Sequence, residues 1–442
     1  MRVRFWGTRG SIAKPGPTTL RHGGNTSCVE VRSSDGTLIV LDCGTGAHGL
    51  GRELAIQSPK RGHLLIGHTH WDHIQGFPFF EPLFMPAQNW SVYAPGGRRR
   101  QLEETLAGQM AYEYSPIDFA SLRAQVAFHE LTEGVLELGD IRVRTQYMNH
   151  PALTLGYRLE CDGAALVYAT DHEPHTLHPE DAEPGAPLIH PEDRRHVRFL
   201  AGADLVIHDA QYTLADFPER AGWGHTPIER AVDYAILAGA KRLALFHHDP
   251  KRHDEAVDRV AAAAQARARA AESALEVFAA SEGSVIELSG SAQLEHPPSR
   301  GVRSALLSQA AARRDRVLIV DDDPVITAVL ERTLESEGVR VERARDVETA
   351  LRVTREARPS LILLDLHLPG RDGLDLCRAL HADPDPGLAE LPVLVLTGAR
   401  VKESDLIDAF TAGAADYLTK PIKPTLVRSR VRGWLLRAAA RV

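Results

Sequence analysis

The sequence predicts an α/β protein of two domains, and three observations carry that prediction. In residues 1–289, strand-like segments come early and late with helical segments between them. This order predicts two packed sheets with helices outside, an αβ/βα sandwich. Residues 314–442 alternate strand and helix five times, which predicts a five-stranded parallel sheet wound on both faces. Residues 290–313 start with Gly and Ser, contain two Pro and become rich in Ala, Leu and Arg, so we expect a linker there.

The strands expected in the first domain are short, rich in β-branched residues and interrupted by Gly, Ser or Asn. They are residues 3–7, 28–32, 37–44, 63–70, 141–148, 156–163, 165–171, 204–210, 242–248 and 284–290. Helices are expected at 226–239, which starts at a Thr-Pro pair, and at the Ala-rich stretch 253–272.

Composition excludes several classes of protein. The net charge is −8 over 442 residues, and the first 312 residues carry all of it, which argues against a nucleic-acid polymer as partner. No apolar run approaches the roughly 18 residues of a membrane helix. The N-terminus has no secretory h-region, and four cysteines form no C-x-x-C pair, so we expect a reducing cytoplasm.

The main chemical signal is a cluster of metal-binding side chains. The chain has 21 His, 19 of them before residue 313, and His68-Thr-His70-Trp-Asp72-His73 follows an apolar strand. Imidazole and carboxylate together suit Zn, Mn or Fe. In an extended segment His68 and His70 point the same way and bind one ion. Asp72 and His73, beyond the turn, then reach a second ion.

This cluster resembles the metallo-β-lactamase superfamily, and the resemblance covers residues 1–290. Further matches are to the branch of tRNA 3′-processing endonucleases and related phosphodiesterases: FWGTRGS, LDCGTG, VYAPGG, MNHP, YATDHEP, HDAQY, GHTP and LFHHDP. The resemblance implies a dinuclear metallohydrolase that uses two Zn or Mn ions. Its implied ligands are His68, His70 and His150 for one ion, and Asp72, His73 and a late His for the other, with Asp171 bridging both.

Two adjacent residues compete for the place of the late ligand. Strand alternation puts Leu243, Leu245 and His247 on one face, and the distance from GHTP also favours His247. The spacing between the histidine and the downstream Arg252-x-Asp254 segment favours His248 instead. We predict His247 and keep His248 as the alternative.

Two side chains are expected to move protons. Asp72 is placed to accept the proton of the attacking water. The resemblance puts His225, in Gly-His-Thr, where the phosphodiesterase branch keeps a general acid or phosphate contact. Where the family usually has a run of small residues with hydroxyl groups, this sequence has Thr226-Pro227. A structural histidine at the start of a helix is the alternative for His225.

Acidic residues end the strands of the second domain. Asp321, Asp322 and Asp323 end its first strand and Asp365 its third, while Thr397 and Lys420 end the fourth and fifth. Parallel strands share one carboxyl rim, where clustered carboxylates need a divalent cation. The segment resembles the two-component receiver domain. That implies phosphorylation on Asp365, Mg²⁺ held by Asp321, Asp322 and the backbone carbonyl of His367, and switch or phosphate contacts from Thr397, Tyr417 and Lys420.

Together the two motif sets predict a hydrolase regulated by phosphorylation. We expect a small phosphodiester substrate such as a cyclic nucleotide, and a sensor histidine kinase or phosphotransfer protein as partner. Whether the chain forms a homodimer is left open. One alternative is a signalling adaptor whose receiver relays phosphate while the hydrolase fold only binds a ligand. Another is a thioester hydrolase like glyoxalase II.

Overall fold

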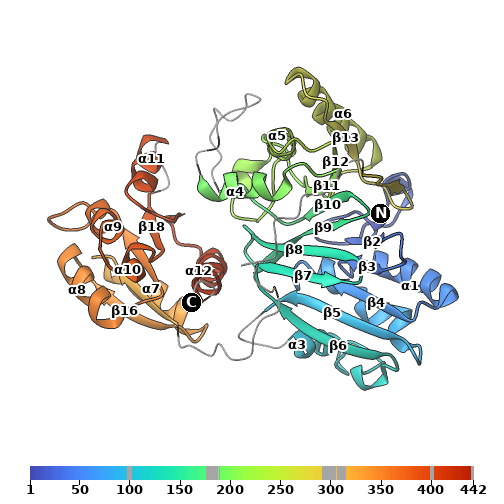
Figure 1. Cartoon of the computed structure of the whole chain (residues 1–442), viewed down its shortest axis with the longest axis horizontal. Helices are drawn as coiled ribbons and strands as arrows, with labels where there is room; N and C mark the ends of the chain where they lie inside the picture. Colours follow the sequence, from blue (N-terminus) through green and yellow to red (C-terminus); the bar gives the residue numbers. More distant parts are fainter. Residues whose placement is uncertain are drawn as a thin grey trace. The chain divides into compact units, whose positions relative to one another are not determined.

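The computed structural model describes residues 1–96, 102–175, 188, 190–290, 305, 315–398 and 403–439. The chain divides into a larger compact unit, Met1–Pro187 with Arg195–Leu307, and a smaller one, Leu188–Arg194 with Ser308–Val442. Figure 1 shows the elements of both. Of the predicted linker 290–313, only residues 290 and 305 lie within the described residues, so the domain boundaries stay a prediction.

The first sheet of the larger unit has seven strands in the order β14-β1-β2-β3-β4-β5-β6. Strands β14, β1, β2 and β3 pair antiparallel, and β3 to β6 pair parallel. The bounds are β1 (Arg2–Gly7), β2 (Cys28–Arg32), β3 (Leu38–Leu41), β4 (Arg61–Leu65), β5 (Asn89–Pro95), β6 (Gln125–Leu131) and β14 (Val285–Glu287).

The second sheet also has seven strands, in the order β13-β12-β11-β10-β9-β8-β7. Strands β7 to β10 pair antiparallel and β10 to β13 parallel. The bounds are β7 (Gly134–Leu138), β8 (Ile141–Met148), β9 (Thr154–Cys161), β10 (Ala164–Ala169), β11 (Leu205–Asp209), β12 (Arg242–Phe246) and β13 (Glu276–Ala279).

The sequence patterns did not indicate four of these strands, β5, β6, β7 and β13. Strand β6 has mostly half-exposed residues because it lies at the edge of its sheet, so its burial pattern lacks a clear alternation. Strand β13 has only four residues and lies at an edge of the second sheet. Short edge strands bury little apolar surface, which weakens their pattern in the sequence.

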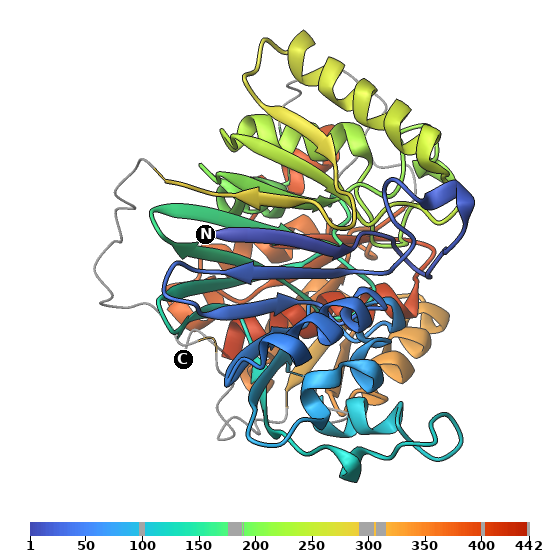
Figure 2. The ribbon, with the colours of Figure 1, turned by 90° about the vertical axis from the view of Figure 1, so that its right-hand side faces the viewer.

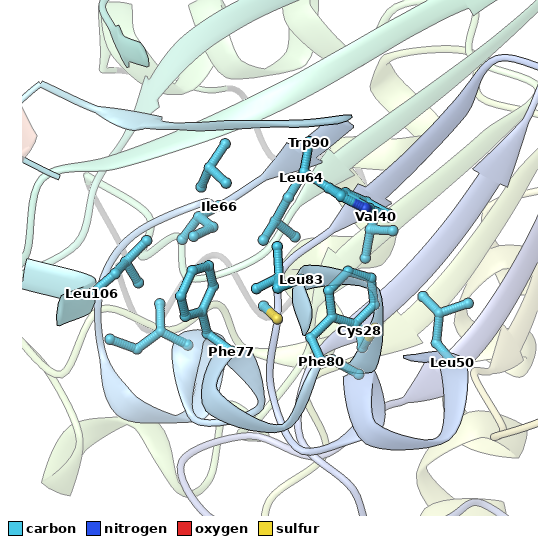
Figure 3. Packing of buried hydrophobic residues seen from close by; sticks show 14 of the residues in the cluster. Cys28, Val40, Leu50, Leu64, Ile66, Phe77, Phe80, Leu83, Trp90 and Leu106 are labelled. Atoms are coloured by element: carbon cyan, nitrogen blue, oxygen red, sulfur yellow. The ribbon is translucent and has the colours of Figure 1, made fainter. Parts of the chain in front are cut away.

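Helices cover the outer face of each sheet. Helix α1 (Gly46–Gln57), α3 (Leu102–Gly108) and the short turns η2 (Phe77–Phe79) and η3 (Glu81–Phe84) pack on the first sheet. In Figure 3, Phe77 and Phe80 lie beneath Leu64 and Trp90 of that sheet. The second sheet carries α5 (Ile228–Leu237) and α6 (Asp254–Ala270), and α4 (Pro191–Leu200) precedes β11 in the chain. Figure 2 shows α6 running along β13. The αβ/βα sandwich and both predicted helices are confirmed.

The smaller unit is a parallel sheet of five strands in the order β16-β15-β17-β18-β19. Apolar clusters lie on both of its faces, as expected for a doubly wound sheet. The strands are β15 (Arg316–Val320), β16 (Arg340–Ala344), β17 (Leu361–Asp365), β18 (Val393–Thr397) and β19 (Asp416–Thr419). The helices are α7 (Pro324–Glu335), α8 (Val347–Ala357), α9 (Leu374–His381), α10 (Pro386–Ala389), α11 (Glu403–Thr411) and α12 (Pro424–Ala439).

A helix that spans a membrane must be both long and apolar. Within the described ranges, no helix is both long and apolar enough to cross a bilayer.

Candidate metal centre

The segment after β4 carries four of the predicted metal ligands into one place. His68 and His70 follow β4, the backbone of His70 is extended, and the one-turn helix α2 (Trp71–Ile74) then turns Asp72 and His73 back toward them. The rings of His68 and His70 are 4.4 Å apart between centroids, and those of His68 and His73 are 4.3 Å apart. The local sequence alone therefore assembles most of the cluster.

The remaining ligands come from the second sheet, each just beyond the carboxyl end of a strand. His150 follows β8, Asp171 follows β10 and His247 follows β12. Asp171 and His247 both have a positive φ, 58° in each case, which turns the chain sharply at the end of its strand. Both sheets thus present their strand ends to the same site.

Two groups of three side chains face one another in this site. The ligand atoms of His68, His70 and His150 lie within 4.8 Å of one another, as do those of Asp72, His73 and His247. Asp171 lies between the groups: its ligand atom is within 4.8 Å of those of His68 and His73, and its Oδ1 is 3.6 Å from His247 Nε2.

His247 and His248 point in different directions. His247 Nε2 lies 3.0 Å from Asp72 Oδ2, inside the cluster. His248 instead donates from Nε2 to the carbonyl of Ala280 at 2.9 Å, and burial lowers its pKa to about 3. Of the two candidates, only His247 is placed to share an ion with Asp72.

Buried neighbours fix the orientation of the ligand rings. Asp42, which has φ 60°, accepts hydrogen bonds from His73 Nδ1 at 2.6 Å, Tyr168 Oη at 2.6 Å and Gly67 N at 2.7 Å. His150 Nδ1 donates to the carbonyl of Gly224 at 3.0 Å. In the neutral ring, such partners hold the proton on one nitrogen and direct the opposite nitrogen at the site, as a metal ligand requires.

The donor set fits divalent ions. Neither ring nitrogen of the buried His68 has a hydrogen-bond partner among the described residues. A buried polar group without a partner is costly, and a metal ion would satisfy one of these nitrogens. Burial alone would lower the pKa of His73, but the carboxylates of Asp72, Asp42 and Asp171 raise it well above its ordinary value. These three carboxylates therefore favour positive charge at His73.

His225 lies beside the cluster with a carboxylate behind it. Its Nδ1 donates to Asp209 Oδ2 at 2.9 Å, and its ring stacks on that of His247 with centroids 5.0 Å apart. Burial opposes protonation of this ring, but Asp209 outweighs it and raises the pKa of His225 to about 9. The pair is therefore built to hold a proton next to the predicted metal ligands.

A second acidic cluster lies at the carboxyl rim of the five-stranded sheet. Lys420 Nζ is 2.7 Å from Asp365 Oδ2 and 3.1 Å from Asp321 Oδ2. The Lys420 N–H donates to the carbonyl of Thr397 at 2.6 Å, which places the threonine at the same rim. Asp323 caps α7 by accepting a hydrogen bond from Val325 N at 2.7 Å.

The other residues predicted for this rim take less buried positions. Asp322 is exposed beside the buried Asp321, and Tyr417 is half-buried in β19. His367 follows Asp365 in the loop after β17, and its N–H lies 3.3 Å from Asp365 Oδ1. The structure thus groups Asp321, Asp365, Lys420 and Thr397 most tightly.

Comparisons with known proteins agree with both halves of this architecture. Residues 37–248 match the family model of the beta-lactamase superfamily domain, and residues 317–432 match that of the response regulator receiver domain. The chain joins a beta-lactamase-fold domain to a receiver domain.

One curated relative matches through the receiver domain. The DNA-binding response regulator MtrA of Mycolicibacterium smegmatis is 42% identical over 124 residues, which are 28% of this chain and 52% of that protein. The chain therefore spans about half the length of this relative.

Solved structures match through the beta-lactamase-fold domain as well, and two of them each cover 65% of this chain. The metallo-beta-lactamase fold protein YhfI from Bacillus subtilis is 17% identical, with 99% of that chain covered and a TM-score of 0.45. The short form of human tRNase Z is 18% identical, with 99% covered and a TM-score of 0.43.

Sequence patterns missed two residues that support the centre of the beta-lactamase-fold domain. Asp209 and Gln211 belong to the HDAQY segment at the end of β11, the strand beside β10. Because Asp171 follows β10, the end of the neighbouring parallel strand lies at the same rim, and this adjacency is the signal that points to Asp209. Gln211 has no such signal, because its contacts depend on how the loop folds.

Proposed function

We propose that the beta-lactamase-fold domain is a metal-dependent hydrolase of small phosphodiesters, and that phosphorylation of the receiver domain regulates it. The observation that carries the proposal is the pairing of a two-ion ligand set with the His225–Asp209 pair. Seven predicted ligands surround one buried centre, and a histidine with a raised pKa lies against them.

In this proposal, His68, His70 and His150 hold one divalent ion, and Asp72, His73 and His247 hold the other. Asp171 lies between the two groups and is assigned to both ions. When bound, two Zn or Mn ions supply Lewis acidity to the attacking and leaving oxygens of a phosphodiester. The described carboxylates and imidazoles supply the mixed oxygen and nitrogen donors that these ions accept.

The chain's own side chains handle the protons. Asp72 Oδ2 accepts from Ser11 N at 2.7 Å, and we assign Oδ1 to receive the proton of the attacking water. His225 gives its proton to the leaving oxygen, while Asp209 holds the ring in position through Nδ1. A small diester is favoured over a polymer because the first 312 residues carry the whole net charge of −8.

The receiver domain supplies the regulatory half of the proposal. Asp365 is the acceptor of the phosphoryl group, Lys420 contacts it, and Asp321 and Asp322 hold Mg²⁺ with the carbonyl of His367. The ion pairs of Lys420 with Asp321 and Asp365 support this assignment, because a cation already offsets the repulsion between the two acids. A sensor histidine kinase or phosphotransfer protein is the proposed donor.

Hydrolysis of bis(p-nitrophenyl) phosphate by the Zn- or Mn-loaded full chain tests the catalytic half. We expect turnover that disappears in His68→Ala and persists in His48→Ala, which changes an exposed histidine on α1. A monoester and a thioester are assayed in parallel. Turnover of the thioester but not of the diester would replace the phosphodiesterase with a glyoxalase-like activity.

A further inference from the structure

An exposed indole lies next to the proposed catalytic histidine. Trp223 is 53% exposed although it is only two residues before His225 in the chain. Large aromatic side chains left open to water beside a reaction centre are typical of ligand contacts. Trp71, between His70 and Asp72, is also exposed, at 74%.

The backbone around Trp223 is held in place. The Glu173 carboxylate accepts hydrogen bonds from Gly222 N at 2.8 Å and from Gly224 N at 2.7 Å, so it binds the residues on both sides of the indole. The carbonyl of Gly224 in turn accepts from His150. Gly224 has φ 90°, and a Cβ there would meet His150 Nδ1 at 2.1 Å, so the loop fits closely against a predicted ligand.

A cation and a second ring accompany the indole. The Arg220 guanidinium carbon lies 4.9 Å from the ring centroid of Trp223 and 5.8 Å from that of Tyr212. The Tyr212 ring meets the Trp223 ring edge-on at 6.4 Å and the His225 ring at 5.7 Å. An exposed indole and a positive charge therefore lie together, and the buried Tyr212 ring connects them to the proton donor.

We propose that Trp223, with Arg220 and Tyr212, forms a subsite for the base of a nucleoside phosphodiester. The inference rests on the proposed phosphodiesterase function and narrows its substrate class. Every nucleobase offers a flat π-face to an indole, and Arg220 attracts the negative charge of the nucleotide. Because Glu173 fixes the loop, little conformational freedom is lost when a base binds. Among the described residues, no cation lies over the ring of Trp71 as Arg220 lies over that of Trp223.

Two substrates with the same leaving group test the subsite. Methyl p-nitrophenyl phosphate and thymidine 5′-(p-nitrophenyl phosphate) both release p-nitrophenolate, but only the second carries a base. We expect the wild-type protein to prefer the nucleoside substrate in kcat/KM by about tenfold, the order of effect that stacking of one base produces. Trp223→Ala should remove most of this preference, and Trp223→Phe should restore it.

The control is Tyr112→Ala, which removes another aromatic side chain, 94% exposed, from a segment after α3. It should leave the preference unchanged. A wild-type protein that hydrolyses both substrates equally well overturns the subsite. The same conclusion follows if Trp223→Ala lowers both rates by one factor, because Trp223 would then act only through the fold.

Binding separates failure of the subsite from failure of the proposed function. If neither diester is hydrolysed, the phosphodiesterase proposal fails, and calorimetry with thymidine 5′-monophosphate and methyl phosphate then decides the subsite. Tighter binding of the nucleotide, lost in Trp223→Ala, supports a base-binding site in a protein of another activity. Equal or absent binding of the two phosphates overturns the inference.

Discussion

Gln211 Oε1 accepts a hydrogen bond from His247 Nδ1 at 2.9 Å, and this contact sets the orientation of the last predicted ligand. The Gln211 amide nitrogen also donates to Ser11 Oγ at 3.1 Å. Ser11 N in turn donates to Asp72. One buried amide thus connects the N-terminal loop, β11 and the residue after β12.

Replacing Gln211 should weaken metal binding without removing a ligand. In Gln211→Leu, His247 loses the acceptor that fixes its Nδ1–H tautomer, and we expect metal affinity to fall about 10- to 100-fold. Competition with a chromophoric chelator during Zn²⁺ titration measures this. Gln57→Leu, on the exposed face of α1, is the matched control and should bind like wild type. Equal affinity of both variants would remove Gln211 from the support of the centre.

Metal loading should stabilise the beta-lactamase-fold domain. Asp72 and Asp171 both contact His73 Nε2, at 3.3 and 3.2 Å, so ions that bind these carboxylates only in the folded state add stability. At about 100 times the dissociation constant the gain is about 2.7 kcal/mol for one ion. This corresponds to a rise of about 5–10 °C in Tm for a domain of roughly this size. Differential scanning calorimetry with and without chelator measures this shift in Tm. A Tm that is the same with and without Zn²⁺ or Mn²⁺ would contradict the metal assignment.

The role of His225 should depend on the leaving group. An alkoxide needs a proton to leave, whereas p-nitrophenolate leaves without one. His225→Ala should therefore lower kcat about 100-fold for a diester with an alkoxide leaving group and much less for bis(p-nitrophenyl) phosphate. Asp209→Asn should follow the same pattern more weakly, because it removes the charge that favours the protonated ring. Equal losses on both substrates would assign His225 to binding rather than to proton donation.

Phosphorylation should distinguish the acids of the receiver domain. With acetyl phosphate and Mg²⁺, Asp365→Ala should take up no phosphoryl group on a phosphate-affinity gel, while Asp323→Ala should be labelled like wild type. Asp323 caps α7, so its replacement should instead lower the stability of the receiver domain by about 1 kcal/mol. Labelling of Asp365→Ala would place the acceptor elsewhere. Diesterase rates of the labelled and unlabelled full chain then test regulation.

The sequence by itself determined those features that come from local spacing. His68, His70, Asp72 and His73 lie within six residues, so one strand end and one turn are enough to bring them together. The rim of the receiver domain was predictable for a related reason: parallel strands end at the same edge, which brings Asp321, Asp365 and Lys420 together. The order of strands and helices along the chain likewise determined both fold classes: strands early and late in the first domain, and strict alternation in the second.

Only the tertiary structure decided contacts between distant segments. Strand alternation favoured His247, but β12 ends at Phe246 and His247 has φ 58°, so alternation does not apply there. The N-terminal loop decides its direction: Gly10 N and Thr8 O bond the backbone of His248, and the His247 side chain then faces Asp72. Asp209, Gln211 and Glu173 act on residues 16 to 51 positions away. These contacts depend on how the chain packs. The residues next to each of these side chains in the sequence do not indicate which distant residue it will contact.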